Sequence, residues 1–146
     1  MINHNVGQTE DKLPVPGNIR IEPRWTDLDP VGHVNNSVFL VYAEEARNRF
    51  LKAVLPDAWD WIVVVRNAVD YHHPVFESDV LEVSSTVAAV GNSSLTTTSV
   101  ISTIHGQRCA TVQTVQVVMR TDRTRTRPWS TDERASLEAR TDPAVS

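Results

Sequence analysis

The sequence contains little cysteine and little glycine. Its 146 residues include one cysteine, Cys109, so the chain can form neither an internal disulfide nor a zinc site built on several thiolates. Only five glycines are present, and none belongs to a phosphate-cradling loop or to a serine nucleophile elbow. These absences point away from disulfide-stabilised domains, P-loop enzymes and serine hydrolases.

Long hydrophobic runs are also missing. The longest, residues 38–43 and 61–65, fall far short of the ~20 residues that a membrane-spanning helix needs. Residues 1–17 lack the basic start and apolar stretch of a signal peptide. Together with the single cysteine, these features predict a protein of the reducing cytoplasm.

Charge is nearly balanced. The chain has 14 basic and 18 acidic residues, which gives a net charge of −4 and a pI of about 5.7. Such a protein has no general attraction to nucleic acid or to anionic membranes, and we expect neither as a partner. The composition, 40% apolar and 22% charged, is typical of one globular domain with its own core.

The start of the chain predicts an arm and one strand. Residues 1–17 are polar and aperiodic, and they are expected to form a flexible N-terminal arm. Residues 18–26 alternate between apolar and polar side chains and predict a strand with a bend at Pro23. Trp25 is expected to pack in the core.

A long helix is predicted over residues 35–54, which contain neither Gly nor Pro. Asn35 or Asn36 is the expected N-cap. The first half of this helix is apolar on every side and is expected to be buried, whereas Arg47 in the second half is expected on the outer, charged face.

The rest of the chain predicts strands and one short helix. Val-rich or Thr-rich alternation indicates strands over residues 61–71, 79–90, 94–104 and 108–120. Within the second of these, Ala89 is expected to share the inner face with Val87. Ser130 and Glu133 form a capping box that opens a helix over residues 130–139.

The predicted fold class is α+β, with one long helix followed by four strands in an antiparallel meander. We assign residues 18–122 to the main domain and residues 123–146 to a C-terminal extension with a short helix. One helix cannot cover both faces of a five-stranded sheet, so a homodimer or homotetramer is expected.

The segment between the first strand and the helix carries the candidate chemistry. Asp27 and Asp29 lie two residues apart, and in an extended segment they would point the same way. They precede a helix N-terminus, where free N–H groups and the helix dipole favour negative charge. A carboxylate beside fixed N–H donors is what acyl transfer requires. The alternative is that both aspartates only form turns and caps.

This segment resembles the signature of the hotdog-fold acyl-CoA thioesterases, of the 4-hydroxybenzoyl-CoA thioesterase-like branch. The resemblance lies in the run Asp27-Leu-Asp-Pro-Val-Gly-His-Val-Asn-Asn36, followed by Phe39, Tyr42 and Glu44-Glu-Ala-Arg47. A later run, Val69-Asp-Tyr-His-His-Pro-Val-Phe-Glu-Ser-Asp79, resembles the same branch more weakly.

The resemblance implies a five-stranded antiparallel sheet wrapped around one long central helix, and a dimer whose sheets run together. It also implies that Asp29 is the catalytic carboxylate and that the backbone N–H of Asn36 polarises the thioester carbonyl, with the acyl group at the subunit interface. The His-Val-Asn-Asn run at 33–36 departs from members with aromatic substrates and is closer to fatty-acyl thioesterases. His33 is either a proton carrier or an orienting group.

Further residues are expected to contact the substrate. Gly32, Asn35 and Phe39 belong to the motif or to the helix that follows it, Tyr42 either packs in the core or touches the acyl group, and Ser94 lines the pantetheine channel or forms a plain hairpin turn.

Arg123 and Arg125 follow the last strand with a spacing of two and could hold the phosphates of coenzyme A. The alternative is a solvated strand end. His72 and His73, adjacent on a strand end, would face opposite ways, so we expect no metal site. No cofactor is expected beyond the coenzyme A of the substrate.

The sequence thus predicts a hydrolase that cleaves acyl-CoA thioesters. Two alternatives stay open: hydrolysis of acyl groups from an acyl carrier protein, and a non-catalytic dimer that binds acyl-CoA. Acyl chain length is not predicted.

Overall fold

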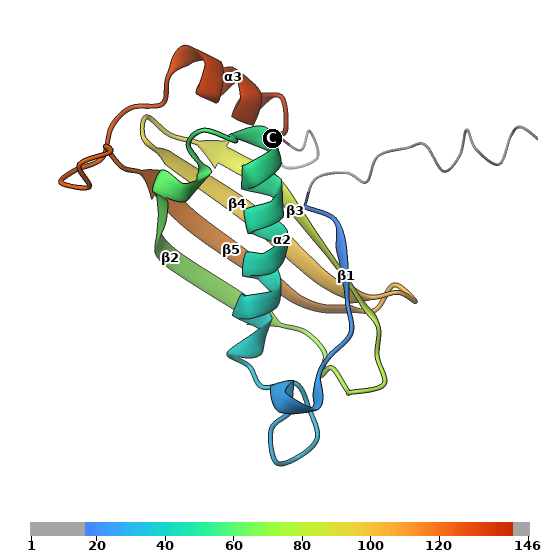
Figure 1. Cartoon of the computed structure of the whole chain (residues 1–146). Helices are drawn as coiled ribbons and strands as arrows, with labels where there is room; N and C mark the ends of the chain where they lie inside the picture. The colour runs from blue at the N-terminus through green and yellow to red at the C-terminus, as the bar shows by residue number, and fades with distance from the viewer. Residues whose placement is uncertain (1–16, 142–146) are drawn as a thin grey trace, which may run out of the picture.

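The computed structural model describes residues 17–141, so the predicted arm lies, apart from Gly17, outside the described residues. An antiparallel sheet of five strands carries one long helix on one face (Figure 1). The strands are β1 (Ile19–Ile21), β2 (Ile62–Tyr71), β3 (Leu81–Val90), β4 (Ser94–Thr103) and β5 (Arg108–Val118). The helices are α2 (Val38–Val54) and α3 (Thr131–Glu138), with short 3-10 helices η1 (Trp25–Asp27) and η2 (Trp59–Trp61). This is the predicted hotdog arrangement of a long helix against an antiparallel sheet.

The order of the strands differs from the predicted meander. The sheet runs β1-β3-β4-β5-β2, so only β3, β4 and β5 follow one another as hairpins. Tight turns at 91–93 and 104–107 make these three strands neighbours, whereas residues 72–80 carry the chain from the β2 edge across to β3, which lies beside β1. β2 consequently pairs with β5 alone and forms an edge.

The first strand is shorter than predicted. β1 ends at Ile21, because Pro23 has no N–H to donate to a ladder and the chain then turns into η1. Trp25 lies in η1 with 77% of its surface exposed, so its expected place in the core is wrong.

Small residues let α2 lie close against the sheet. Phe39, Ala43, Ala46 and Phe50 recur at helical spacing and are all buried, the two alanines completely. The facing strands alternate as expected, but β3 has a bulge between Val87 and Ala89. The extra residue reverses the alternation, so Ala89 is exposed rather than on the inner face.

Arg47 lies on the sheet side of α2 and not on the predicted outer face. It is 4% exposed, and its Nη1 donates to Thr114 Oγ1 of β5 at 3.1 Å. Thr114 donates in turn to Asn67 Oδ1 of β2 at 2.8 Å. Burial lowers the pKa of the guanidinium, and the nearby Glu44 opposes that effect. A polar network therefore joins the middle of the helix to the two strands at the β2 edge.

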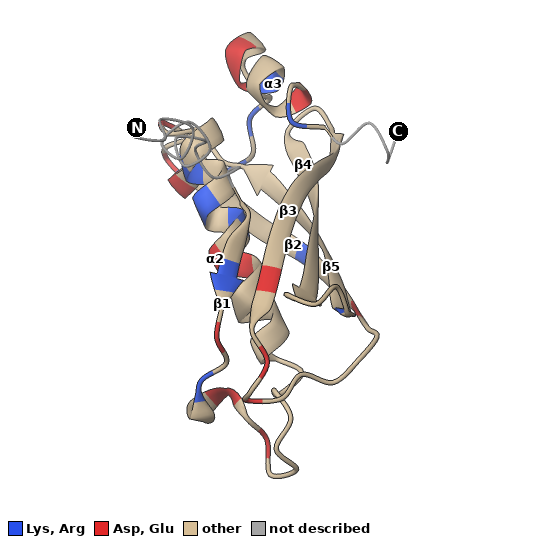
Figure 2. Ribbon diagram, turned by 90° about the vertical axis from the view of Figure 1, so that its right-hand side faces the viewer, with Lys and Arg blue, Asp and Glu red and all other residues tan. Residues whose placement is uncertain are grey.

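The side of the sheet away from α2 has no helix over it in the described part of the chain (Figure 2). The long helix thus covers one face only, as predicted. Neither helix described here is long and apolar enough to cross a membrane.

The C-terminal helix is held by its predicted cap. Glu133 N–H donates to Ser130 Oγ at 3.1 Å, and Ser130 N–H donates to the Glu133 carboxylate at 2.8 Å. Arg127 adds two parallel bonds to the same carboxylate, at 2.7 and 2.9 Å. The Arg127 bonds are the main reason that the pKa of Glu133 falls from 4.5 to about 2.

We predict that Glu133→Gln destabilises the fold in a pH-dependent way. A lowered folded-state pKa makes the ionised carboxylate stabilising above pH 4.5, and this contribution disappears as the pH falls toward 2. The variant should lose about 1–2 kcal/mol of unfolding free energy at pH 7, measured by urea titration, and the difference should shrink below pH 4.5.

The exposed Glu45–Arg49 pair on α2, with atoms 2.8 Å apart, supplies the control. Glu45→Gln should cost under about 0.5 kcal/mol at any pH. Equal losses for the two variants at pH 7 would contradict a special role for the Arg127–Glu133 pair.

Candidate functional site

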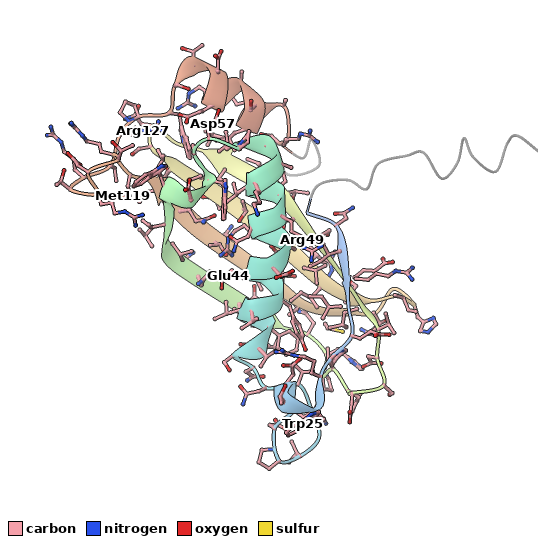
Figure 3. All side chains as sticks on the ribbon, in the orientation of Figure 1. Trp25, Glu44, Arg49, Asp57, Met119 and Arg127 are labelled. Carbon is pink, nitrogen blue, oxygen red and sulfur yellow. The ribbon has the colours of Figure 1, made fainter. Side chains whose placement is uncertain are left out.

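A pocket of about 280 Å³ lies between the start of α2 and the end of β2. Its wall includes Asp29, His33, Asn36 and Phe39, which the motif had singled out, together with Tyr71 and His73. It belongs to the end of the molecule where Trp25 projects (Figure 3). The structure therefore brings all three predicted catalytic residues to one pocket.

A tight turn holds the loop that contains Asp29. Gly32 N–H donates to the Asp29 carbonyl oxygen at 3.0 Å, which closes a four-residue turn with Pro30 at its second position. Gly32 has a φ of +83°, a conformation that side-chain-bearing residues adopt only with strain. This explains why the run between Asp29 and Gly32 has the sequence Asp-Pro-Val-Gly.

One oxygen of the Asp29 carboxylate is fixed by this loop. The N–H groups of Val31 and His33 donate to Oδ1 at 3.0 and 3.1 Å. The other oxygen, Oδ2, accepts no hydrogen bond within the described part of the chain. Oδ2 is therefore the oxygen of Asp29 that is available for chemistry.

Backbone bonds attach this loop to the segment after β2. Asp29 N–H donates to His33 O at 2.7 Å, and Val34 N–H donates to Val75 O at 2.8 Å. The His33 ring meets Phe76 edge-on, with 4.9 Å between the ring centroids. His33 is thus held at the mouth of the pocket by packing as well as by its backbone.

The start of α2 differs from the predicted one. The helix begins at Val38, with Ser37 in the N-cap position and neither Asn35 nor Asn36 there. Asn35 instead organises the approach: its N–H donates to Asp27 O at 2.8 Å, its Oδ1 accepts from Ser37 N–H at 3.0 Å, and its carbonyl accepts from Val38 N–H at 2.9 Å.

The N–H of Asn36 is the exception in this segment. Among the four N–H groups of residues 35–38, it alone has no acceptor within residues 17–141. Because Asn36 also lines the pocket, this N–H is a free donor beside the Asp29 loop. That property is what an oxyanion donor requires.

Asp27 and Asp29 have different surroundings, so the expectation that they point the same way is wrong. Asp27 lies in η1 and not in an extended segment, and it is 3% exposed. Its carboxylate accepts from Tyr42 Oη at 2.7 Å and from the backbone and guanidinium of Arg24 at 2.9 and 3.0 Å. Asp27 thus ties the loop to α2, whereas Asp29 borders the pocket.

Burial and hydrogen bonding shift the pKa values of Asp27 and Tyr42 in opposite directions. Burial alone would raise the pKa of Asp27, but the bonds from Arg24 and Tyr42 outweigh it and lower that pKa. Burial and the neighbouring carboxylate raise the pKa of the Tyr42 phenol. Tyr42 therefore stays a hydrogen-bond donor to Asp27, buried in the core rather than lining the pocket.

Three residues that were predicted to contact the substrate do not line this pocket. Arg123 stacks on Trp61 with 4.6 Å between its guanidinium carbon and the ring centroid. Arg125 shares its loop and accepts a backbone bond from Arg120. Ser94 opens β4, and its carbonyl accepts from Trp129 Nε1 at 2.9 Å. The loop that bears the two arginines lies between Met119 and Arg127, at the opposite end of the molecule from Trp25 (Figure 3).

Sequence reasoning missed three pocket residues at the end of β2. Tyr71 donates from its hydroxyl to Asn36 O at 2.8 Å. His72 and His73 both line the pocket, although a continuing strand would have sent them to opposite faces. The strand ends at Tyr71, as predicted, so the side chains of His72 and His73 no longer follow the alternation of a strand. Within residues 17–141 no group of three His, Cys, Asp or Glu side chains is placed to hold a metal ion.

Comparison with known proteins gives consistent matches. A family model described as the Thioesterase-like superfamily matches residues 23–137. A thioesterase from Thermus thermophilus, solved with coenzyme A and zinc, is 34% identical, with a TM-score of 0.77 over 84% of this chain and 91% of that one. A predicted thioesterase from Bacillus stearothermophilus is 30% identical, with a TM-score of 0.79 over 86% and 96% of the two chains. The uncharacterized protein YsmA of Bacillus subtilis (strain 168) is 26% identical over 121 residues, which cover 81% of this chain and 82% of YsmA.

We predict that Tyr42→Phe destabilises the fold through Asp27. The change removes the 2.7 Å bond to a buried carboxylate and leaves the ring in place. The unfolding free energy at pH 7 should fall by about 1.5–3 kcal/mol, the range for hydrogen bonds to charged groups. Unfolding in urea measures this, and a stability equal to that of the wild type would show that the bond contributes nothing.

Proposed function

The chain belongs to the thioesterase-like superfamily and is a thioester hydrolase with a hotdog fold, and we propose that it cleaves acyl-CoA esters to the free acid and coenzyme A. The observation that carries the proposal is the pairing, in one pocket, of a carboxylate with one free oxygen and a helix-start N–H with no acceptor. The solved relative with bound coenzyme A supports this class of substrate. No cofactor beyond the substrate's coenzyme A enters the proposal.

In the proposed mechanism the thioester carbonyl lies between these two groups. Its oxygen accepts from the Asn36 N–H, which stabilises the negative charge that develops there during attack. Asp29 Oδ2 either attacks the carbonyl carbon or takes a proton from the attacking water. The tetrahedral intermediate then expels the thiolate of coenzyme A; on the first route, water hydrolyses the resulting anhydride and releases the acid.

The remaining predicted residues have supporting roles in this proposal. Gly32 permits the turn that presents Asp29, Asn35 fixes the peptides around the free N–H, and Phe39 forms an apolar wall for the acyl group. We assign His33 an orienting role, because its backbone N–H donates to Asp29 Oδ1 and its ring packs edge-on against Phe76.

The β2 edge supports a dimer. β2 is ten residues long and is paired on one side only, and Val63, Val64 and Val65 are 40%, 42% and 59% exposed. A long, apolar, unpaired edge strand is a template for pairing with another chain. We propose that a second copy of the chain pairs with it through a two-fold axis, as most homodimers do.

Such pairing would place the arginine loop next to the pocket. In an antiparallel pair of β2 strands centred on the axis, Tyr71 lies opposite the partner's Ile62. Ile62 follows Trp61, on which Arg123 stacks. The partner's Arg123 would therefore border this pocket, where it can bind the phosphates of coenzyme A, and the partner's Arg125 lies in the same loop.

We predict that Asp29→Asn abolishes hydrolysis while the fold persists. Free thiol released from short, medium, long and aromatic acyl-CoAs is the measurement, with thermal unfolding as the check on folding. The variant should lose about 10³-fold or more in kcat, because the amide can neither attack nor accept a proton as the carboxylate does.

The same panel separates the alternatives. Full activity of Asp29→Asn would show that the assigned carboxylate is wrong. Wild-type protein that cleaves acyl carrier protein esters but no acyl-CoA would transfer the proposal to that substrate. Retention of acyl-CoA without turnover would instead identify a binding dimer.

We predict that two damaged variants complement each other if the site is shared. Asp29→Asn removes the carboxylate, and Arg123→Glu should raise the KM for acyl-CoA. Refolding them together in equal amounts should restore about a quarter of the wild-type sites, because each mixed dimer regains one site with both residues intact. A mixture no more active than its components would place Arg123 outside the partner's site.

A further inference from the structure

The peptide group that follows Asn36 is held at both of its ends. Its carbonyl oxygen, that of Asn36, accepts from Tyr71 Oη at 2.8 Å, and its N–H, that of Ser37, donates to Asn35 Oδ1 at 3.0 Å. Asn36 precedes the first residue of α2, so regular helical structure does not define its conformation. The bond from β2 supplies a restraint that the helix does not.

The Tyr71 side chain is itself positioned to provide this restraint. Its ring meets Phe39 edge-on, with 5.4 Å between the centroids, and Phe39 is 2% exposed on the buried face of α2. The phenol is otherwise at the surface, with Tyr71 47% exposed. A ring on an edge strand, packed against Phe39, thus reaches the backbone just before the facing helix.

The free N–H of Asn36 belongs to the peptide between Asn35 and Asn36. The carbonyl oxygen of this same peptide, that of Asn35, accepts from Val38 N–H at 2.9 Å. The peptide before it is fixed by the 2.8 Å bond from Asn35 N–H to Asp27 O, and the peptide after it by Tyr71 and the Asn35 side chain. With both neighbours fixed, this peptide cannot rotate without breaking a hydrogen bond. Its N–H keeps one direction before substrate binds, which makes an oxyanion donor effective.

We propose that Tyr71 is a positioning residue of the thioesterase site, which aims the Asn36 N–H from the β2 side of the pocket. The inference rests on the proposed function and gives a role to a residue to which the sequence analysis assigned none. Tyr71 touches neither reacting atom; it acts through the backbone of Asn36. Its hydroxyl donates to that carbonyl and so is not itself the oxyanion donor.

The test is Tyr71→Phe, which removes the hydroxyl and keeps the ring on Phe39. We expect kcat to fall by about tenfold, less than the ~10²–10³ typical of losing an oxyanion donor, and KM to stay within about twofold. Asn36→Pro, which deletes the N–H, calibrates the larger loss. Arg134→Met is the matched control, because it removes a side-chain bond to a backbone carbonyl, that of Gly91 at 2.7 Å, far from the pocket.

A second measurement distinguishes orientation of the Asn36 N–H by Tyr71 from a general effect of Tyr71 on the packing of the pocket. When a nucleophile, Asp29 or the activated water, adds to a trifluoromethyl ketone analogue of acyl-CoA, the tetrahedral adduct has its oxygen where the carbonyl oxygen would develop charge; a thioether analogue has no such oxygen. Tyr71→Phe should weaken binding of the ketone by the same factor as kcat and leave binding of the thioether unchanged, as measured by calorimetry.

Three outcomes would overturn the inference. Wild-type kcat in Tyr71→Phe would show that the hydroxyl does not aim the N–H. Equal weakening of both analogues would show that Tyr71 only shapes the pocket. A wild-type protein without thioesterase activity would overturn the proposed function and this inference with it.

Discussion

The 2.7 Å hydrogen bond between the Tyr42 phenol and the buried Asp27 carboxylate is the constraint on which the site depends. Asp27 stands where the chain leaves η1, and its carbonyl oxygen also accepts from Asn35 N–H. The loop between these two residues therefore begins and ends at one anchor on the core-facing side of α2. Asp27 therefore fixes the position of Asp29 and its turn relative to the helix, although Asp27 itself does not line the pocket. Breaking that bond would leave the buried Asp27 carboxylate without its partner on the helix, so separation of the loop from α2 costs free energy.

Much of the fold could be predicted from the sequence, because the spacing of apolar residues and the turn and cap residues identify the individual helices and strands. The helix without Gly or Pro, the hairpins around Gly91 and Gly106, and the capping box at Ser130 depend on neighbours in the chain. The strand order does not, because alternation says nothing about which edge β2 joins. Arg47 was misplaced for a similar reason: a charged side chain is expected outside, and its polar partner Thr114 lies on a distant strand.

The residues of the site also fall into those that the local sequence predicts and those that only the tertiary structure brings together. Asp29, His33, Asn36 and Phe39 lie within eleven consecutive residues, and a short motif was sufficient to select them. The role of Asp27 required knowing that η1 replaces an extended chain. Tyr71 and His73 come to the pocket only because β2 ends beside the start of α2, which is a consequence of strand order. What the sequence missed is the part of the site that tertiary structure assembles.

The buried Arg47 network has a consequence for the phase of the helix. The Arg47 guanidinium has its partner, Thr114, at one position on β5, so only one position of α2 along its own axis allows this hydrogen bond. A shift of the helix by one turn, ~5.4 Å, would leave the charge buried without that partner. The same setting determines where α2 begins, at Val38, nine residues before Arg47 in the chain. Thr114, buried on β5, and its partner Asn67 on the β2 edge therefore help to fix where the pocket lies relative to the sheet. A core residue thus influences the chemistry at the start of the helix, about 14 Å away along the helix axis.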